Sequence, residues 1–163
     1  MTTNMREEKE IVYFRHLFNE DIDGTSGGIL MPQKLQEVFP GFIDPRLLNW
    51  GTKATWSTCV KVSEIIKNGK FLDFFESSVF ELSQTCLHWG HVVYFCKFHR
   101  AKLQTGGLPT LFLIVENGEP VKQDLSNVFV VEVLFGQYGF LEAYLFEFLS
   151  DATWVAGCRI VVN

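Results

Sequence analysis

Residues 87–98 read LHWGHVVYFCKF, and this stretch decides how the rest of the chain is interpreted. At about 100° per residue, a helix would place its large side chains on two opposite faces. One face would carry Trp89, Val92, Val93 and Cys96, and the other His91, Tyr94, Phe95 and Phe98. A helix that is apolar on both faces is buried in a bundle or in a membrane. Because the segment is short and charged residues follow it, we expect a buried central helix that begins at the Trp-Gly pair.

Length and composition limit the class of protein. A chain of 163 residues suits one domain, over residues 1–163, with a single sizeable core. Hydrophobic residues make up 47% and aromatic residues 15%, so burial can outweigh chain entropy and disorder is not expected. The net charge of -5, without a cluster of Lys and Arg, argues against a nucleic-acid-binding protein.

The cysteines and the chain ends bear on the compartment. No two of the four cysteines form a CxxC pair, and residues 6–10 alternate in charge, unlike a secretory leader. Free thiols in a reducing compartment are therefore expected. The stretch WVAGCRIVVN, residues 154–163, is interrupted by Arg159 and is shorter than the roughly 20 apolar residues of a membrane span.

Apolar spacing predicts further helices around the central one. Helical periodicity is expected over residues 5–18, 32–39, 46–67 and 70–84. Asn68-Gly69 suits a helix end, because both residues tolerate a left-handed conformation. The run PTLFLIVENGEPV, residues 109–121, has a turn-like Asn117-Gly118 between apolar segments and could be extended. These elements predict an all-α bundle around a central hydrophobic helix.

Metal and catalytic sites find little support in the sequence. A zinc site could draw on Cys86, His88, His91, Cys96 and His99. On one helix, however, His88 and His99 would lie roughly 16 Å apart, so these side chains cannot converge on one ion. No nucleophile elbow or related signature occurs, and catalysis is not expected.

A calcium-binding regulatory protein is the alternative from another class. The loop NEDIDGTSGGIL, residues 19–30, carries Asn19, Asp21, Asp23 and Gly24 at the offsets of an EF-hand. Its twelfth position is Leu30, where a bidentate Glu is required. An acidic surface loop is the simpler interpretation of this pattern.

Residues 75–103, FESSVFELSQTCLHWGHVVYFCKFHRAKL, resemble the first homology region of the Bcl-2 family and the helix that leads into it. The matching positions are Phe75-Glu76, Glu81-Leu82, Trp89-Gly90, Phe95 and Phe98. Weaker similarity covers residues 6–18, 34–39 and 132–140. His91 replaces the family's Arg and His88 replaces its Asn, and these eroded motifs resemble the viral members of the family, those of gammaherpesviruses in particular.

The resemblance implies a Bcl-2-like helical bundle with a surface groove that inhibits host-cell apoptosis. It implies binding of the BH-3 helices of Bak, Bax and BH-3-only proteins such as Bim, and of Beclin in autophagy. No cofactor, metal, nucleic acid or stable membrane insertion is expected, and the protein would be a monomer in the host cytoplasm that partners recruit to mitochondria. The expected groove residues are Ser78, Leu82, His88, Trp89, Gly90, His91, Val93, Tyr94 and Phe98. Within this set, Phe98 suits a core position better than a groove, and His91 would face the partner's Asp.

Overall fold

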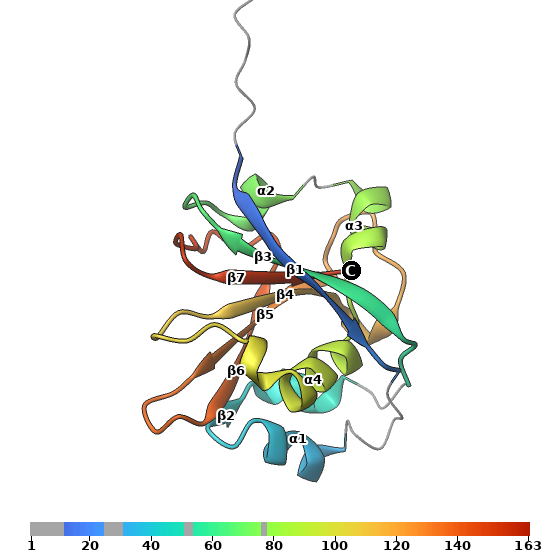
Figure 1. The fold of residues 1–163 in the computed structure, drawn as a ribbon. Coiled ribbons are helices and arrows are strands. Elements are labelled where there is room, and N and C mark those ends of the chain that lie inside the picture. The colour runs from blue at the N-terminus through green and yellow to red at the C-terminus, as the bar shows by residue number, and fades with distance from the viewer. Residues whose placement is uncertain (1–11, 25–30, 51–53, 76–77) are drawn as a thin grey trace, which may run out of the picture.

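A computed structural model describes residues 12–24, 31–50, 54–75 and 78–163, and it contains a seven-stranded mixed sheet (Figure 1). The strands are β1 (Phe14–Ile22), β2 (Phe42–Ile43), β3 (Thr58–Ile65), β4 (Thr110–Val115), β5 (Val128–Phe135), β6 (Leu141–Glu147) and β7 (Arg159–Val162). The helices are α1 (Pro32–Val38), α2 (Phe71–Phe74), α3 (Val79–Thr85) and α4 (Trp89–Phe98). Short 3-10 helices are η2 (Pro45–Asn49), η3 (Arg100–Lys102) and η4 (Glu116–Gly118).

The strands follow the order β1-β3-β7-β4-β5-β6-β2. Most neighbours run antiparallel, whereas β4 with β7 and β2 with β6 run parallel. β1 lies at one edge and has an irregular register between His16 and Phe18, a feature that bends an edge strand. The very short β2 is the strand at the other edge, beside β6.

Local sequence explains the strands. In β3, Val60 and Val62 are fully buried while Lys61 between them is exposed, which is the period of two expected for a strand with one covered face. β4, with the sequence TLFLIV, is buried at every position, as a strand covered on both faces should be. This run ends at η4, where Asn117 and Gly118 adopt positive φ angles of 52° and 65°.

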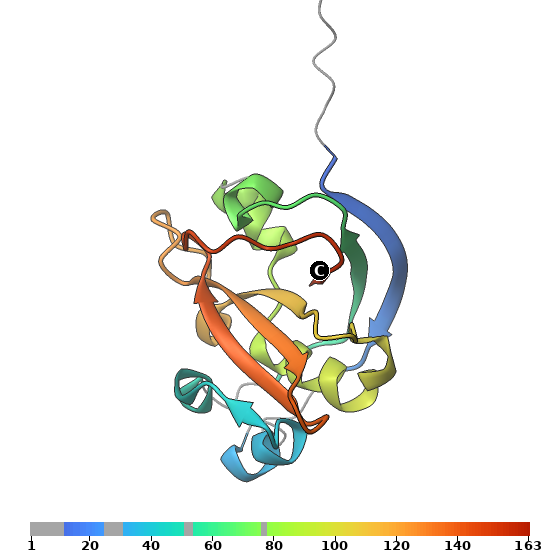
Figure 2. The ribbon, with the colours of Figure 1, turned by 90° about the vertical axis from the view of Figure 1, so that its left-hand side faces the viewer.

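Two hydrophobic clusters cover the two faces of the sheet. One cluster joins α1 and α4 to the sheet through Leu35, Val93 and Ala143. The other joins α2 and α3 to the opposite face through Phe71 and Leu82. The two pairs of helices accordingly lie at opposite ends of the molecule in both views (Figures 1 and 2).

The expectation of an all-α bundle is wrong, because the described residues form a mixed α/β fold. Phe14–Phe18, expected as the end of a first helix, begins β1, and the expected helix 46–67 contains η2 and β3. The expected helix 70–84 is divided into α2 and α3. Residues 132–140, a stretch of weaker similarity to the Bcl-2 family, run from β5 into the following turn. Of these segments, β3 shows the alternation of buried and exposed side chains that matches the pleat of a sheet, at Val60, Lys61 and Val62.

Several local predictions are confirmed. The short helix at 32–39 is α1, and the expected buried helix begins at Trp89 and buries most of its residues, although it packs on the sheet and not at the centre of a helical bundle. The extended run with its Asn117-Gly118 turn is also present, as β4 and η4. In the part of the chain that the structure describes, no helix combines the length and apolar character needed to cross a bilayer.

Candidate functional site

The residues expected to form a groove are divided between the two faces of the sheet. Leu82 is 1% exposed in the cluster with Phe71, whereas Trp89 and Val93 belong to the cluster on the α4 side. Ser78 caps α3, its hydroxyl accepting a hydrogen bond from the Glu81 amide at 3.1 Å. The set therefore does not line one groove.

His91 is a buried structural histidine. The His88 amide donates to Nδ1 at 3.0 Å, so the ring proton must lie on Nε2, which is 3.0 Å from the Trp56 carbonyl oxygen. Burial lowers the pKa of His91 to about 4, so the ring is neutral near pH 7. With backbone groups at both nitrogens, the ring is not placed to contact a partner's Asp.

The outer side of α4 carries aromatic residues. Phe98 is 56% exposed, so its interpretation as a core residue is wrong. Tyr94 packs beside it and donates to the Asp23 carboxylate at 3.1 Å. Trp56, 55% exposed, packs edge-on against His88 with ring centres 4.5 Å apart. Tyr94 is thus paired with Phe98, and Trp56 with His88.

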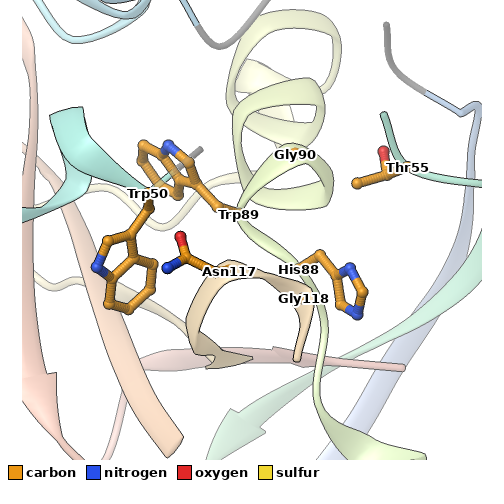
Figure 3. A pocket seen from close by; sticks show the side chains of 7 residues that line it. All are labelled: Trp50, Thr55, His88, Trp89, Gly90, Asn117 and Gly118. Atoms are coloured by element: carbon orange, nitrogen blue, oxygen red, sulfur yellow. The ribbon is translucent and has the colours of Figure 1, made fainter. Parts of the chain in front are cut away.

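A small cavity lies at the first turn of α4 (Figure 3). Its free volume is about 20 Å³, which is room for one water-sized group. Gly118 permits the close approach of the His88 ring, because a Cβ there would lie 2.8 Å from Nδ1. The lining residues are Trp50, Thr55, His88, Trp89, Gly90, Asn117 and Gly118. This cavity is too small for a peptide side chain.

The metal and thiol chemistry weighed from sequence gains no support. Among the described residues, no three His, Cys, Asp or Glu side chains are grouped to hold a metal ion. Asn19 and Asp21, the first two proposed EF-hand ligands, lie in β1, and positions 25–30 fall outside the described residues. All four cysteines are free, and burial raises the pKa of Cys86 to about 12, so that thiol is not an activated nucleophile.

A larger cleft lies at the turn between β5 and β6. Its free volume of about 360 Å³ falls within the range of roughly 300–1,000 Å³ that is usual for ligand sites. The turn is closed by the Gly136 amide, which donates to the Phe140 carbonyl at 2.8 Å, and by Gly139 at a φ of 76°. The lining residues are Pro40, Gly41, Gly136, Gln137, Tyr138, Phe140 and Glu142.

Two glycines make room for the Glu142 side chain in this cleft. A Cβ on Gly136 would lie 2.6 Å from Glu142 Oε1, and one on Gly41 would lie 2.8 Å from Glu142 Cγ. The Tyr144 hydroxyl donates to Glu142 Oε2 at 3.1 Å, which orients the carboxylate. Burial, and then this contact with the carboxylate, raise the pKa of Tyr144, so the phenol stays protonated as the donor.

Exposed aromatic residues line the same cleft as that carboxylate. Tyr138 is 81% exposed and Phe140 is 52% exposed, although aromatic side chains of this size are often buried in a folded protein. Phe42 from β2 stacks on Tyr144 with ring centres 4.8 Å apart. Arg100 supports the turn by donating to the Gly139 carbonyl at 3.0 Å, and it is not among the cleft-lining residues. The cleft is thus aromatic and acidic.

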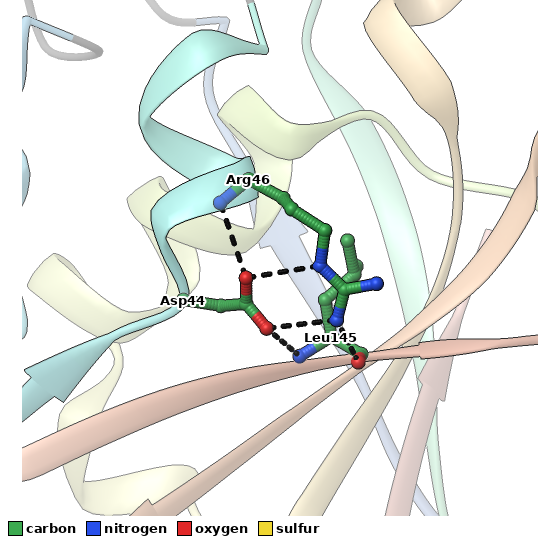
Figure 4. A network of polar contacts seen from close by, with 3 residues as sticks. All are labelled: Asp44, Arg46 and Leu145. Carbon is green, nitrogen blue, oxygen red and sulfur yellow. Dashed lines mark hydrogen bonds and ion pairs between the residues drawn. The ribbon is translucent and has the colours of Figure 1, made fainter.

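A polar network holds β2 beside β6 and so fixes Phe42 (Figure 4). The Asp44 carboxylate accepts from Arg46 Nε at 3.0 Å and from the Leu145 amide at 3.3 Å. Arg46 also donates to the Leu145 carbonyl at 2.7 Å. The hydrogen bonds from Arg46 hold the pKa of Asp44 below its ordinary value.

The chain matches no known protein-family model, no curated protein and no solved structure. The cleft was missed at the sequence level, although a signal for it exists. Gly136-Gln-Tyr-Gly139 separates two segments rich in apolar, β-branched and aromatic residues, which is the pattern of a β-hairpin. Two exposed aromatics in such a turn indicate a contact site, since large apolar side chains gather on surfaces that bind.

Proposed function

We propose that this chain is a non-catalytic binding module and that the cleft at the β5–β6 turn binds a positively charged segment of a partner protein. One observation carries the proposal: the exposed rings of Tyr138 and Phe140 line the same cleft as the Glu142 carboxylate. A Lys or Arg side chain can contact both the rings and the carboxylate, because its cation is attracted to ring faces and to a carboxylate.

Charge favours the same kind of partner. Among the described residues, no Lys or Arg lines the cleft, and the whole chain has a net charge of -5. A negative protein attracts basic segments over a distance and orients them as they approach. The neutral rings add a contact that salt weakens less than it weakens a surface ion pair. The proposal is therefore a basic segment held by rings and one carboxylate.

The BH-3-binding function implied by the Bcl-2 resemblance depended on a groove between helices. A BH-3 helix needs apolar pockets spaced along one surface. Leu82 and Val93, expected in that surface, lie in clusters on opposite faces of the sheet. Inhibition of apoptosis therefore rests on the sequence resemblance alone, and the cleft is the better-supported site.

Calorimetric titration tests the proposal. A flexible lysine-bearing peptide, its glutamate-bearing counterpart and a BH-3 peptide are compared on the native protein and on Glu142→Gln. Of the three peptides, we expect only the lysine-bearing one to bind. Glu142→Gln should weaken its binding about tenfold, which is the effect of losing one charge-assisted contact. Glu119→Gln, an exposed substitution beside η4, is the matched control. Equal binding of the two charged peptides, or tighter binding of the BH-3 peptide, would contradict the proposal.

A further inference from the structure

A second carboxylate, that of Glu132, lies on the same face as the cleft. Glu132 in β5 is directly opposite Tyr144 in β6. Val131 and Val133 on either side of it belong to the cluster on the α4 face. Because side chains alternate along a strand, Glu132 points to the opposite face, which it shares with Tyr144 and Glu142.

Glu132 is only partly exposed, yet it has no partner within the described chain. No described residue forms a hydrogen bond or an ion pair with its carboxylate, and burial raises its pKa with no opposing charge. A partly desolvated charge without compensation destabilises a fold, so such groups are usually paired. The missing cation is available from a bound partner.

The spacing of the two carboxylates suggests how that partner is built. Glu142 is two residues from Tyr144, the cross-strand partner of Glu132, so the two glutamates are diagonal neighbours. Diagonal neighbours in an antiparallel pair lie about 7–8 Å apart. In an extended peptide, side chains at positions i and i+2 point the same way and are separated by about 7 Å.

We infer that this face binds an extended peptide with two basic side chains at alternating positions, one against Glu142 in the cleft and the other against Glu132. This inference rests on the proposed function and specifies its partner. Tyr144 neighbours both contacts, directly opposite Glu132 and two residues from Glu142, and its ring, stacked on Phe42, gives the peptide a flat surface. A peptide with lysines three positions apart points them to opposite sides and reaches one carboxylate only.

Three peptides test the inference by calorimetry: one lysine, two lysines separated by one glycine, and two lysines separated by two glycines. We expect the one-glycine peptide to bind about tenfold more tightly than the other two, as for one added charge-assisted contact. Glu132→Gln should abolish that advantage, so that the one-glycine peptide binds no more tightly than the two-glycine peptide. Glu142→Gln should weaken all three peptides.

The outcomes separate this inference from the proposed function. If both two-lysine peptides bind equally, or if Glu132→Gln changes nothing, the second contact is absent while the single-cation cleft stands. If no lysine peptide binds, this inference and the proposed function are both overturned. Glu132→Gln removes an unpaired charge from a half-buried place, so the variant should fold. The second contact can also be tested on the native protein, by replacing the second lysine of the one-glycine peptide with norleucine.

Discussion

The Glu142 carboxylate occupies the space that a side chain at position 136 would need. A Cβ at position 136 would lie 2.6 Å from Glu142 Oε1, well inside van der Waals contact. The glycine is therefore matched to the glutamate across the β5–β6 turn. This relationship makes the position of the carboxylate testable without removing its charge.

Gly136→Ala should displace the Glu142 side chain and weaken binding of the basic peptide several-fold, because the carboxylate would leave the Tyr144 hydroxyl and the cleft. Calorimetry on the variant measures the loss, and Gln137→Ala in the same turn is the control. Unchanged affinity in Gly136→Ala would show that the placement of the carboxylate by this glycine is irrelevant to binding.

Asp44→Asn should destabilise the protein at neutral pH by about 1–3 kcal/mol, the usual contribution of hydrogen bonds to a charged group. Because hydrogen bonds from Arg46 lower the pKa of Asp44 in the folded state, its contribution is present above the ordinary value of 3.8 and is lost as pH falls below it. Urea unfolding from pH 7 to pH 3 measures this. The native protein should lose stability below about pH 4 more steeply than Asp44→Asn, and parallel curves would refute the assignment.

His91 should make folding stability fall as pH drops from about 6.5 to about 4. Its folded-state pKa is lowered to about 4 by burial, so the unfolded chain binds the proton first and stability rises with pH across this window. The total effect is about 3 kcal/mol, because each pKa unit corresponds to about 1.4 kcal/mol. His91→Gln keeps a donor and an acceptor but does not titrate, so its stability should be flatter between these pH values. An equally steep profile in the variant would assign the effect to another group.

Thiol labelling tests the burial of the sheet and of α4. Cys59 is exposed, whereas Cys86, Cys96 and Cys158 are buried, and burial raises the pKa of each buried thiol. A neutral thiol reagent should modify one cysteine in the native protein and four after denaturation. Cys59→Ser should leave the native protein unreactive on the same timescale. Rapid reaction of a second thiol would contradict the packing of α4 or β7.

How far the sequence predicts this fold depends on whether a segment fits one periodicity only. The stretch beginning at Trp89 is apolar on all sides and too long for a typical strand, and it forms the expected helix. Val60 and Val62 alternate with the exposed Lys61, but the expected helix at 46–67 that contains them also fits helical spacing. Long-range pairing with β1 and β7 decides between the two, and a local pattern does not contain that information.

The cleft depends even more on long-range pairing. Phe42 meets Tyr144 only because β2 joins the sheet beside β6, and the network of Asp44 and Arg46 holds it there. The Gly136-to-Gly139 turn was recognisable, whereas the contact of Gly41 with Glu142 was not. The expected groove failed for the same reason, since it assumed that neighbours in sequence, such as Leu82 and Trp89, would share one surface.

Chemical-shift mapping of the labelled protein with the two-lysine, one-glycine peptide tests the central claim most directly. We predict saturable shifts of the amides of residues 136–144 and of Glu132, with little change at Trp56, Tyr94 and Phe98, and no shifts with the glutamate peptide. Shifts concentrated on the α4 aromatics, or none at the turn between β5 and β6, would contradict the account.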